Sequence, residues 1–503
     1  MVLKSFEKET KVAEILAVIT ILAVNLLLKV PVVSKGFFAF TFDQGRDFLQ
    51  VAKIIYDGKP ALIGPTTGQQ GIFYGPTWYY FLSPILYVSG GDPQKVAIIF
   101  SLLGTFTLLC LYLFFRFNTK PLLLALSLGV IASMSSFWMI GPTVIWNTAL
   151  TPLLMILVAY LIGKIVQKPQ ALSFLLLGVA IFLIFESEMP WGIAMIMFTL
   201  LCPFIFKKYF LKKNFLFTIL GFLIVLTPRI LFNLRHNLLE VGSVIKYLQE
   251  PRIYGQQQSL TTRAIGRLDL YWGIFSETFT KGNKTIGLVL AVFLLVIILL
   301  TRSNKSVWVK FKSDFILKYF AYLVIFSLII FTFFKDIVWA YYLIGLPISL
   351  FIIIFRIFNF SILEKRAKKV SILVIVFLFI FNFNYQLFYP FKITWLGDNA
   401  TYRNEKAVVD YIASQNPHSY AIYSYSPAIF DYAFDYLIYW YTKSKRLEKP
   451  TQSSNSFYLI IREASSGRYL YSGWYGDKTK DNTSVLEAKQ FNGDLLVEKH
   501  QIK

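Results

Sequence analysis

The chain has 503 residues, of which 56% are hydrophobic and 18% aromatic, and its mean hydropathy is +0.57. Only 16% of the residues are charged, whereas roughly 25% is usual in soluble domains. This composition argues against a soluble protein and predicts a polytopic membrane protein. The net charge of +22 does not indicate nucleic-acid binding, because the Lys and Arg residues cluster in short links between apolar runs, as topology signals do.

Two further features fit a membrane protein that keeps its first span. Cys110 and Cys202 both lie inside apolar runs, which predicts buried thiols and favours neither a disulfide framework nor a thiolate metal site. The first apolar run lacks a small-residue cleavage site and is followed by many more such runs. We therefore expect an uncleaved helix at the N-terminus.

Apolar segments long enough to cross a membrane recur along the chain, and each crossing needs about 20 such residues. They predict eleven spans, at residues 12–31, 95–115, 121–140, 145–163, 171–186, 189–206, 215–233, 285–301, 315–334, 338–355 and 370–388. With these spans, the basic links all fall on the side of the N-terminus: Lys4, Lys8, Lys11, Arg116, Lys120, Lys164, Lys168, Lys207, Lys208, Lys212, Lys213, Arg302, Lys305, Lys310, Lys312, Arg356, Lys365, Arg366, Lys368 and Lys369. The positive-inside rule makes that side the cytoplasm and places the C-terminus outside it.

The opposite face receives two long segments, a first outer loop at 32–94 and a second at 234–284, together with the turns at Gly141, Glu186 and Lys335. In the first loop, residues 47–56 have the spacing of an amphipathic helix, 64–76 are rich in turn residues, and 79–90 suit an interfacial helix. We expect this loop to roof an outward-facing cavity. The second loop is basic, through Arg235, Lys246, Arg252, Arg263 and Arg267, and an anionic partner is one explanation.

The segment 390–503 has a different character. It predicts a helix at 398–415, a strand at 421–426, an aromatic amphipathic helix at 430–445 and a strand at 456–464. This alternation suits a small extracytoplasmic α/β domain, and it carries no catalytic motif. The expected fold is thus mostly α, with a polytopic helical membrane domain at 1–389 and a small α/β domain at 390–503.

The most informative cluster is DQGRD, Asp43 to Asp47, directly after the first span. Asp43 and Asp47 are four residues apart and would share one face of a helix, with Arg46 between them. Acidic residues at the mouth of a membrane cavity are candidates for function, and Asp43 is the candidate general base. In the plain alternative, Asp43 caps the helix and Asp47 pairs locally with Arg46 or Lys53.

Other charged residues lie at the ends of spans on the same face. Glu186 and Glu188 read either as an exposed turn or as part of the site. Cations at such positions often reach toward lipid headgroups, but here they gather on one face, where Arg and Lys suit a phosphate; they are Arg229, Arg235, His236 and Lys335. Trp146 and Asn147 read as an interfacial Trp and a capping Asn. The sequence has no HExxH, CxxC, Walker or GxSxG motif, so ATP-driven transport is not indicated.

Four stretches of the chain resemble the GT-C glycosyltransferases. They are FDQGRDFLQVAKIIYDGKPALIGPTTGQQGIFYGPTWYYFLSP, TVIWNTALTPLL, PRILFNLRHNLLEVGSVIKYL and KDIVWAYYLIGLPISL. Enzymes of this group, such as protein mannosyltransferases and the aminoarabinose transferase of lipid A, span the membrane many times and take sugar from polyprenyl-phosphate donors. The resemblance implies that Asp43 is the catalytic base and that Arg235 and Lys335 hold the donor phosphate.

The chain also departs from the pattern of this group. Tyr74 stands where many relatives have His, and Glu186-Ser187-Glu188 replaces a Gln-x-His-like pattern. The resemblance therefore carries neither the sugar nor the acceptor. We expect transfer with inversion to a hydroxyl of a lipid, glycan or protein, and no cofactor. Asp43, Asp47, Glu186 and Glu188 are hard oxygen ligands, but nothing in the sequence brings them together around a metal.

Three rival functions remain open at this point. A lipid or oligosaccharide transporter or flippase would place polar residues near the middle of its spans, whereas here they lie at the span ends. A polysaccharide polymerase would share the topology. A non-catalytic membrane scaffold would need no site at all.

Overall fold

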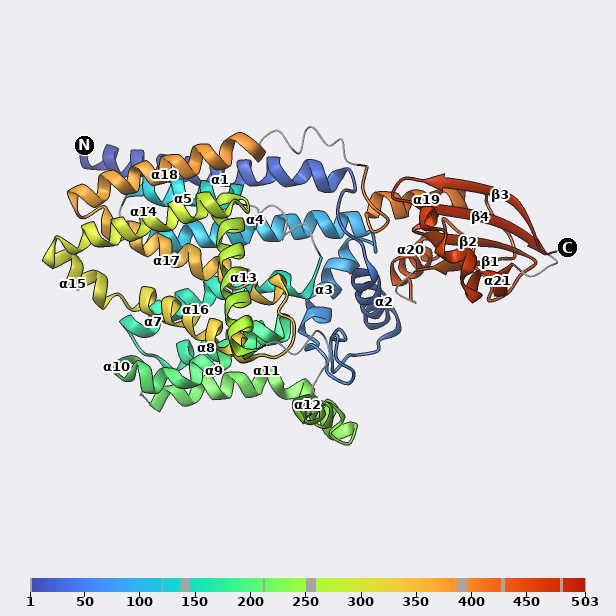
Figure 1. The fold of residues 1–503 in the computed structure, drawn as a ribbon, viewed down its shortest axis with the longest axis horizontal. Helices are drawn as coiled ribbons and strands as arrows, with labels where there is room; N and C mark the ends of the chain where they lie inside the picture. Colours follow the sequence, from blue (N-terminus) through green and yellow to red (C-terminus); the bar gives the residue numbers. More distant parts are fainter. Residues whose placement is uncertain are drawn as a thin grey trace.

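The structure is a computed structural model that describes residues 2–119, 121–135, 137, 145–210, 213–249, 259–386, 396–426, 430–479 and 483–502. Its helices run side by side in a long bundle, and a small sheet lies beyond one end of that bundle (Figure 1). We call this the sheet end. The N-terminus lies at the opposite end, which we call the N-terminal end.

Each of the eleven predicted spans corresponds to a helix. These helices are α1 (Val2–Ser34), α4 (Pro93–Phe117), α5 (Leu122–Met134), α7 (Thr151–Gln167), α8 (Ala171–Ser187), α9 (Met189–Ile205), α11 (Leu216–Arg235), α14 (Lys284–Arg302), α16 (Phe315–Phe333), α17 (Leu346–Ser361) and α18 (Lys365–Gln386). Within the described residues, seven helices are long and apolar enough to cross a membrane, and 122–132, 171–187 and 189–205 are shorter apolar helices. The predicted turn at Gly141 lies outside the described residues.

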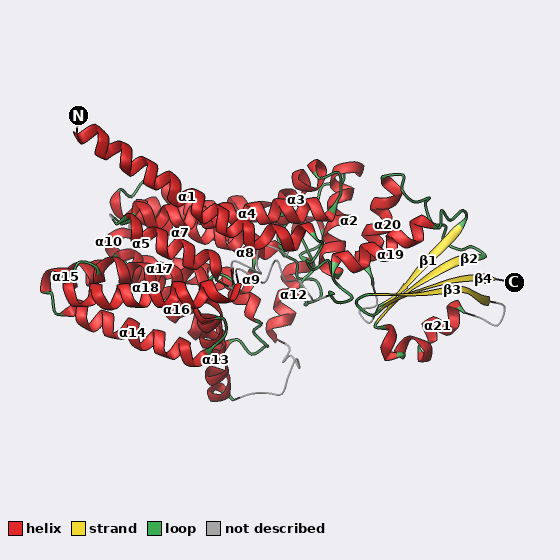
Figure 2. Cartoon of the chain, turned by 90° about the horizontal axis from the view of Figure 1, so that it is seen from above, coloured by secondary structure: helices red, strands yellow, loops and turns green. Residues whose placement is uncertain are grey.

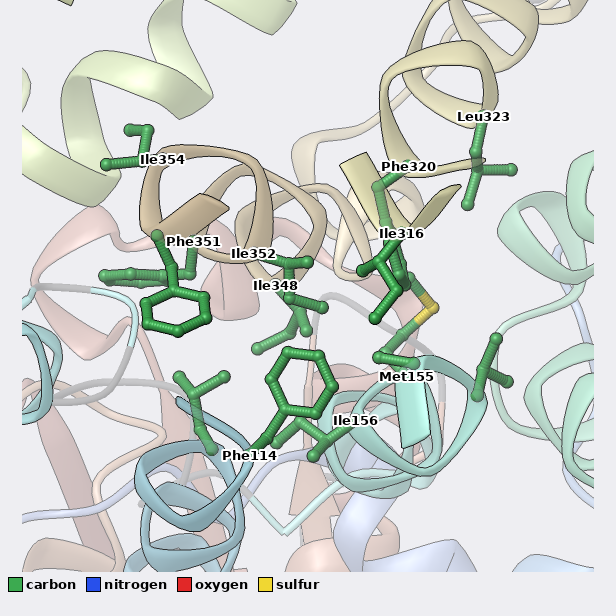
Figure 3. Packing of buried hydrophobic residues seen from close by; sticks show 14 of the residues in the cluster. Phe114, Met155, Ile156, Ile316, Phe320, Leu323, Ile348, Phe351, Ile352 and Ile354 are labelled. Carbon is green, nitrogen blue, oxygen red and sulfur yellow. The ribbon is translucent and has the colours of Figure 1, made fainter. Parts of the chain in front are cut away.

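The bundle is held together by interdigitated apolar side chains. Phe114 of α4, Ile156 of α7, Ile316 of α16 and Ile348 of α17 meet in one buried cluster (Figure 3). Large apolar side chains also cover the outside of the helices, as Leu216 of α11 does. A helix that is apolar both inside and outside the bundle is suited to lipid rather than water.

The basic links gather at the N-terminal end, as predicted. Helices α10 (Lys207–Phe210) and α15 (Lys305–Ser313) lie at the same end of the bundle as the N-terminus (Figure 1). Arg116 at the end of α4 forms an ion pair with Glu14 of α1, and the Asn359 amide donates to the Asn118 carbonyl at 3.2 Å. Lys120 and Lys212 lie outside the described residues. That this end faces the cytoplasm stays a prediction.

The first outer loop contains α2 (Phe42–Asp57) and α3 (Thr77–Val88). Helix α2 begins five residues before the predicted start, because Thr41 and Gln44 cap it: the Thr41 N–H donates to the Gln44 side-chain oxygen at 2.7 Å. Asp43 therefore lies in the first turn of α2, and the alternative that Asp43 is the cap is wrong.

The described residues of the second outer loop are largely helical. This loop contains α12 (Leu239–Gln249) and α13 (Leu260–Thr280), and α13 runs across the other helices (Figure 1). Arg263 donates to the Phe333 carbonyl at 3.1 Å and Arg267 to the Asp336 carbonyl at 2.7 Å. These guanidinium groups satisfy free carbonyls at and just beyond the end of α16, so they account for part of the basic charge without an anionic partner. Arg252 lies outside the described residues.

The C-terminal region has a four-stranded sheet in the order β1-β2-β4-β3, with β1 and β2 parallel and the other pairs antiparallel. Its elements are α19 (Tyr402–Ser414), β1 (Tyr420–Tyr425), α20 (Tyr432–Lys443), β2 (Ser456–Arg462), α21 (Gly473–Lys478), β3 (Thr483–Phe491) and β4 (Leu495–Ile502). The four predicted elements are confirmed, and β3 and β4 are additional. The expected domain boundary at 389/390 lies outside the described residues.

Short 3-10 helices join several of these elements. They are η2 (Asn147–Leu150), η3 (Lys213–Phe215), η4 (Ala340–Leu343), η5 (Ala464–Ser466) and η6 (Arg468–Tyr471). Of these, η2 directly precedes α7 of the bundle, and η4 lies just before α17.

Candidate active site

Helix α2 is wedged between the bundle and the C-terminal region (Figure 1, Figure 2). Its Gly45 lies directly against α20, since a Cβ built there would be 2.1 Å from the Tyr432 carbonyl oxygen. Phe48 packs edge-on against Tyr436, with ring centroids 5.0 Å apart. The preceding strand-like segment joins the same region, because Ala39 pairs with Thr401. The helix that carries the acidic cluster is thus fixed by the C-terminal region.

The acidic cluster forms a connected set of ion pairs. Arg46 Nη1 lies 2.9 Å from Asp43 Oδ1, and Arg46 Nη2 lies 2.9 Å from Asp47 Oδ1. The same guanidinium donates to the Thr66 hydroxyl at 3.2 Å. Asp43 and Asp47 differ sharply in exposure, with 48% of the Asp43 side chain and 4% of the Asp47 side chain accessible. Of these two carboxylates, Asp43 is therefore the one that a substrate can reach.

Asp47 holds α2 against α3. Its carboxylate accepts a hydrogen bond from the buried indole N–H of Trp78 at 2.7 Å. Burial raises the pKa of Asp47 to about 6, although Arg46 and the Trp78 hydrogen bond act in the other direction. This confirms the local pairing with Arg46 that the sequence suggested and gives Asp47 a positioning contact that no sequence pattern indicated.

The turn-rich segment folds back onto the end of α8. The N–H of Gly64 donates to the Tyr74 carbonyl at 2.8 Å, and the N–H of Tyr74 donates to the Pro65 carbonyl at 2.9 Å. Gly75 then lies against a carboxylate, because a Cβ there would be 1.8 Å from the Glu186 Cδ. The Thr77 hydroxyl donates to the same carboxylate. Only a glycine allows this close approach.

Glu186 and Glu188 are both buried, so the alternative of an exposed turn is wrong. The Asn147 amide donates to the Ser187 carbonyl at 2.6 Å, and the Ser187 hydroxyl donates to the Asn147 carbonyl at 2.6 Å. Asn147 therefore clamps the turn between α8 and α9 instead of capping a helix. Trp146 precedes this clamp, and its ring centroid lies 6.2 Å from that of Tyr341.

Tyr74 connects the two carboxylate-bearing segments. Burial raises the pKa of Tyr74 well above its usual range, and the negative charges of Glu188 and, more weakly, Asp43 raise it further. Tyr74 is thus a neutral hydroxyl within electrostatic range of both carboxylates. Tyr341 and Tyr342 also raise the pKa of Tyr74, and the sequence analysis did not single them out. Their only signal was their place in the stretch KDIVWAYYLIGLPISL.

The cations suggested for the donor phosphate fall into two groups. Arg229 is buried and occupied: it forms an ion pair with Glu240 and donates to the Phe73 carbonyl at 2.8 Å. Arg235 and Lys335 are exposed, and in the described part of the chain neither forms an ion pair. His236 is exposed and stacks on Phe232 at 4.4 Å. No described contact joins Arg235, His236 or Lys335 to Asp43.

The described residues contain no group of three or more His, Cys, Asp and Glu side chains arranged to hold a metal ion. The candidate groups are the four carboxylates, the Tyr74 hydroxyl, the Trp146 indole and the exposed cations Arg235 and Lys335.

No protein-family model and no curated protein sequence matches this chain. Among solved structures, it is similar to ArnT from Cupriavidus metallidurans bound to undecaprenyl phosphate, with 11% identity, a TM-score of 0.54, and 96% of this chain and 97% of that chain covered. It is also similar to apo ArnT from Cupriavidus metallidurans, with 11% identity, a TM-score of 0.58 and 98% of each chain covered. The resemblance to the GT-C group is thereby confirmed at the level of the fold: along nearly its whole length, this chain has the ArnT fold.

Proposed function

We propose that this chain is an integral membrane glycosyltransferase that moves a sugar from a polyprenyl-phosphate donor to a hydroxyl acceptor on the extracytoplasmic face. The observation that carries the proposal is Asp43. It is a half-exposed carboxylate on a helix fixed by the C-terminal region, at the sheet end of a bundle with the ArnT fold. One of the similar ArnT structures is bound to undecaprenyl phosphate, and this supports a donor of that class.

In the proposed reaction, Asp43 accepts the proton of the acceptor hydroxyl as its oxygen attacks the anomeric carbon of the donor. The bond between that carbon and the phosphate oxygen breaks, and polyprenyl phosphate leaves. A single displacement of this kind inverts the anomeric configuration. The sugar arrives already activated, so no nucleotide is required at this face.

The remaining groups have defined roles in this proposal. Arg46 fixes the Asp43 carboxylate from one side through their 2.9 Å ion pair. Arg235 and Lys335 are exposed and free of ion pairs within the described residues, so they are suited to the charge that builds on the leaving phosphate. The neutral Tyr74 hydroxyl is a hydrogen-bond donor beside the acidic groups.

A transfer assay tests the proposal. The purified protein in lipid nanodiscs is incubated with undecaprenyl-phosphate sugars labelled in the sugar, together with an envelope lipid and glycan extract as acceptor. Enzyme-dependent release of undecaprenyl phosphate and label in a new product are the expected results. Movement of intact labelled donor across a vesicle bilayer, with no new glycosidic bond, would instead identify a flippase.

The side of the membrane is tested separately with reporter fusions. A periplasmic-type reporter fused after Lys503 should be active, and the same reporter fused in the link at Lys208 should be inactive. Activity of a cytoplasmic reporter at Lys503 would reverse the orientation and place Asp43 at the cytoplasmic face.

A further inference from the structure

Buried polar atoms without partners remain in the turn between α8 and α9. Both carboxylate oxygens of Glu188 are buried and have no hydrogen-bond partner among the described residues. The indole nitrogen of Trp146 is likewise buried and unpartnered. A buried carboxylate with nothing to accept from is costly, and native proteins rarely leave one unless a missing group completes it. Glu188 therefore needs a partner that the described residues do not supply.

The two residues are neighbours in space because a clamp joins them. Asn147, directly after Trp146, and Ser187, directly before Glu188, exchange two hydrogen bonds of 2.6 Å each. The Gly192 N–H donates to the Glu188 carbonyl at 2.9 Å and fixes the start of α9. Gly192 itself lies against the backbone of Phe185, since a Cβ there would be 2.1 Å from the Phe185 Cα. These contacts hold the turn between α8 and α9 in place, and with it the buried position of Glu188.

The unpartnered atoms have a definite hydrogen-bonding character. Glu188 offers two acceptors, Trp146 offers one donor, and they do not bond to each other. Two aromatic side chains are associated with them: the ring of Tyr341 lies 6.2 Å from that of Trp146, and Tyr74 is within electrostatic range of Glu188. A phosphate does not suit this group, because burial already raises the pKa of Glu188 well above its usual range and a second negative charge beside it would raise that pKa further. A sugar ring does fit, because its hydroxyls donate, its ring oxygen accepts and its C–H faces pack on aromatic rings.

We propose that Glu188 and Trp146 form the subsite for the sugar of the donor, with Glu188 accepting hydrogen bonds from sugar hydroxyls and Trp146 donating to a sugar oxygen. This inference rests on the proposed function and adds to it, because it separates sugar recognition at the turn between α8 and α9 from phosphate recognition at the exposed cations. Glu188 and Asp43 both lie within electrostatic range of Tyr74.

The test compares binding of two lipids to the full-length protein in nanodiscs. One probe is undecaprenyl phosphate, and the other is a panel of undecaprenyl-phosphate hexoses and pentoses. Wild-type protein should bind at least one sugar-bearing lipid more tightly than the sugar-free lipid. Glu188→Gln should reduce that preference about tenfold to a hundredfold, and Trp146→Phe about threefold to tenfold, with binding of the sugar-free lipid unchanged. Deoxy analogues of the preferred donor identify the hydroxyl, because the analogue that lacks it should bind wild type and Glu188→Gln equally.

Two controls separate recognition from folding. Glu277→Gln changes an exposed carboxylate on α13, and Trp308→Phe changes a Trp of α15 at the N-terminal end; both should leave the preference intact. Without ligand, Glu188→Gln should unfold at the same temperature as wild type or a higher one, because burial raises the pKa of Glu188 well above its usual range, so wild type loses stability as the pH rises toward ionisation and the neutral Gln does not. A lower unfolding temperature, or equal weakening of both lipids, would overturn the subsite. If wild type binds neither kind of lipid, the proposed function fails and the subsite with it.

Discussion

The site contains two pairs of carboxylates that are close in sequence, and the two pairs are arranged in the same way. On α2, Asp47 is bound by Arg46 and Trp78, whereas Asp43 is half exposed. At the end of α8, Glu186 is bound by Thr77 and lies under Gly75, whereas Glu188 has no partner among the described residues. In each pair one carboxylate fastens the first outer loop, and the other remains available.

The two pairs differ in how far water reaches the carboxylate that does not fasten the loop. Asp43 retains access to solvent, so the hydroxyl of a substrate can reach it. Glu188 is buried, so hydrogen bonds that it makes with a ligand are not weakened by water. The pair on α2 suits acid–base chemistry, and the pair at α8 suits recognition.

The largest expected effect comes from the free member of the first pair. Asp43→Asn keeps the shape of the side chain but removes the base, so transfer should fall about 10²–10⁴-fold while the amount of folded protein holds. Labelled-sugar transfer and size-exclusion profiles measure the two quantities. Near-normal transfer by this variant would falsify the assignment of the base.

The fastened member of the first pair should instead control stability. The pKa of Asp47 is raised from 3.8 to about 6 in the folded protein, so its contribution to stability is full below about pH 4 and is lost as the pH rises through about 6. A shift of about 2 units corresponds to roughly 3 kcal/mol for this fully buried group. Thermal unfolding of wild type should thus move to lower temperature between pH 4 and pH 7, and Asp47→Asn should flatten this dependence. An unchanged pH profile in Asp47→Asn would show that other groups cause it.

The comparison also predicts that the position of α2 matters as much as its charges. Gly45→Ala places a Cβ against the Tyr432 carbonyl and forces α2 away from α20, at a cost of about 1–3 kcal/mol. Transfer should fall with a smaller loss of folded protein. The matched control is Gly273→Ala in α13, where a Cβ would meet nothing within 4 Å. Equal activity of the two variants would mean that the contact with α20 does not position Asp43.

The smallest expected effects concern the cations, of which Arg229 is ion-paired, whereas Arg235 and Lys335 form no ion pair among the described residues. Arg235→Ala and Lys335→Ala should each weaken binding of undecaprenyl phosphate by about 1–2 kcal/mol, since both side chains are exposed and partly screened. Arg229→Ala should reduce stability instead, because it leaves Glu240 buried without its partner. Lys318→Ala, on an exposed position near the start of α16, is the control. If all four variants weaken lipid binding equally, the effect is general and no phosphate site has been found.

The sequence by itself determined the features that depend on composition along the chain. Long apolar runs predict helices wherever they occur, and basic links mark one end, so the helices of the bundle and the common end of Arg116 and Lys305 were predictable. Alternation of strand and helix patterns likewise predicted α19, β1, α20 and β2. The candidate base could also be proposed from the sequence, because Asp43 lies in an acidic cluster just beyond a span.

Tertiary structure alone decided which member of each carboxylate pair is free. Asp43 and Asp47 look alike in sequence, and only the packing of α3 brings Trp78 to one of them. Glu186 and Glu188 read as a surface turn until Gly75, 111 residues earlier, is seen against the first of them. The second outer loop contains α13, whose Arg263 and Arg267 donate to carbonyls at and just beyond the end of α16, a contact that the sequence did not indicate. Burial and hydrogen bonding between distant segments are properties of the folded chain, so local sequence patterns do not predict them.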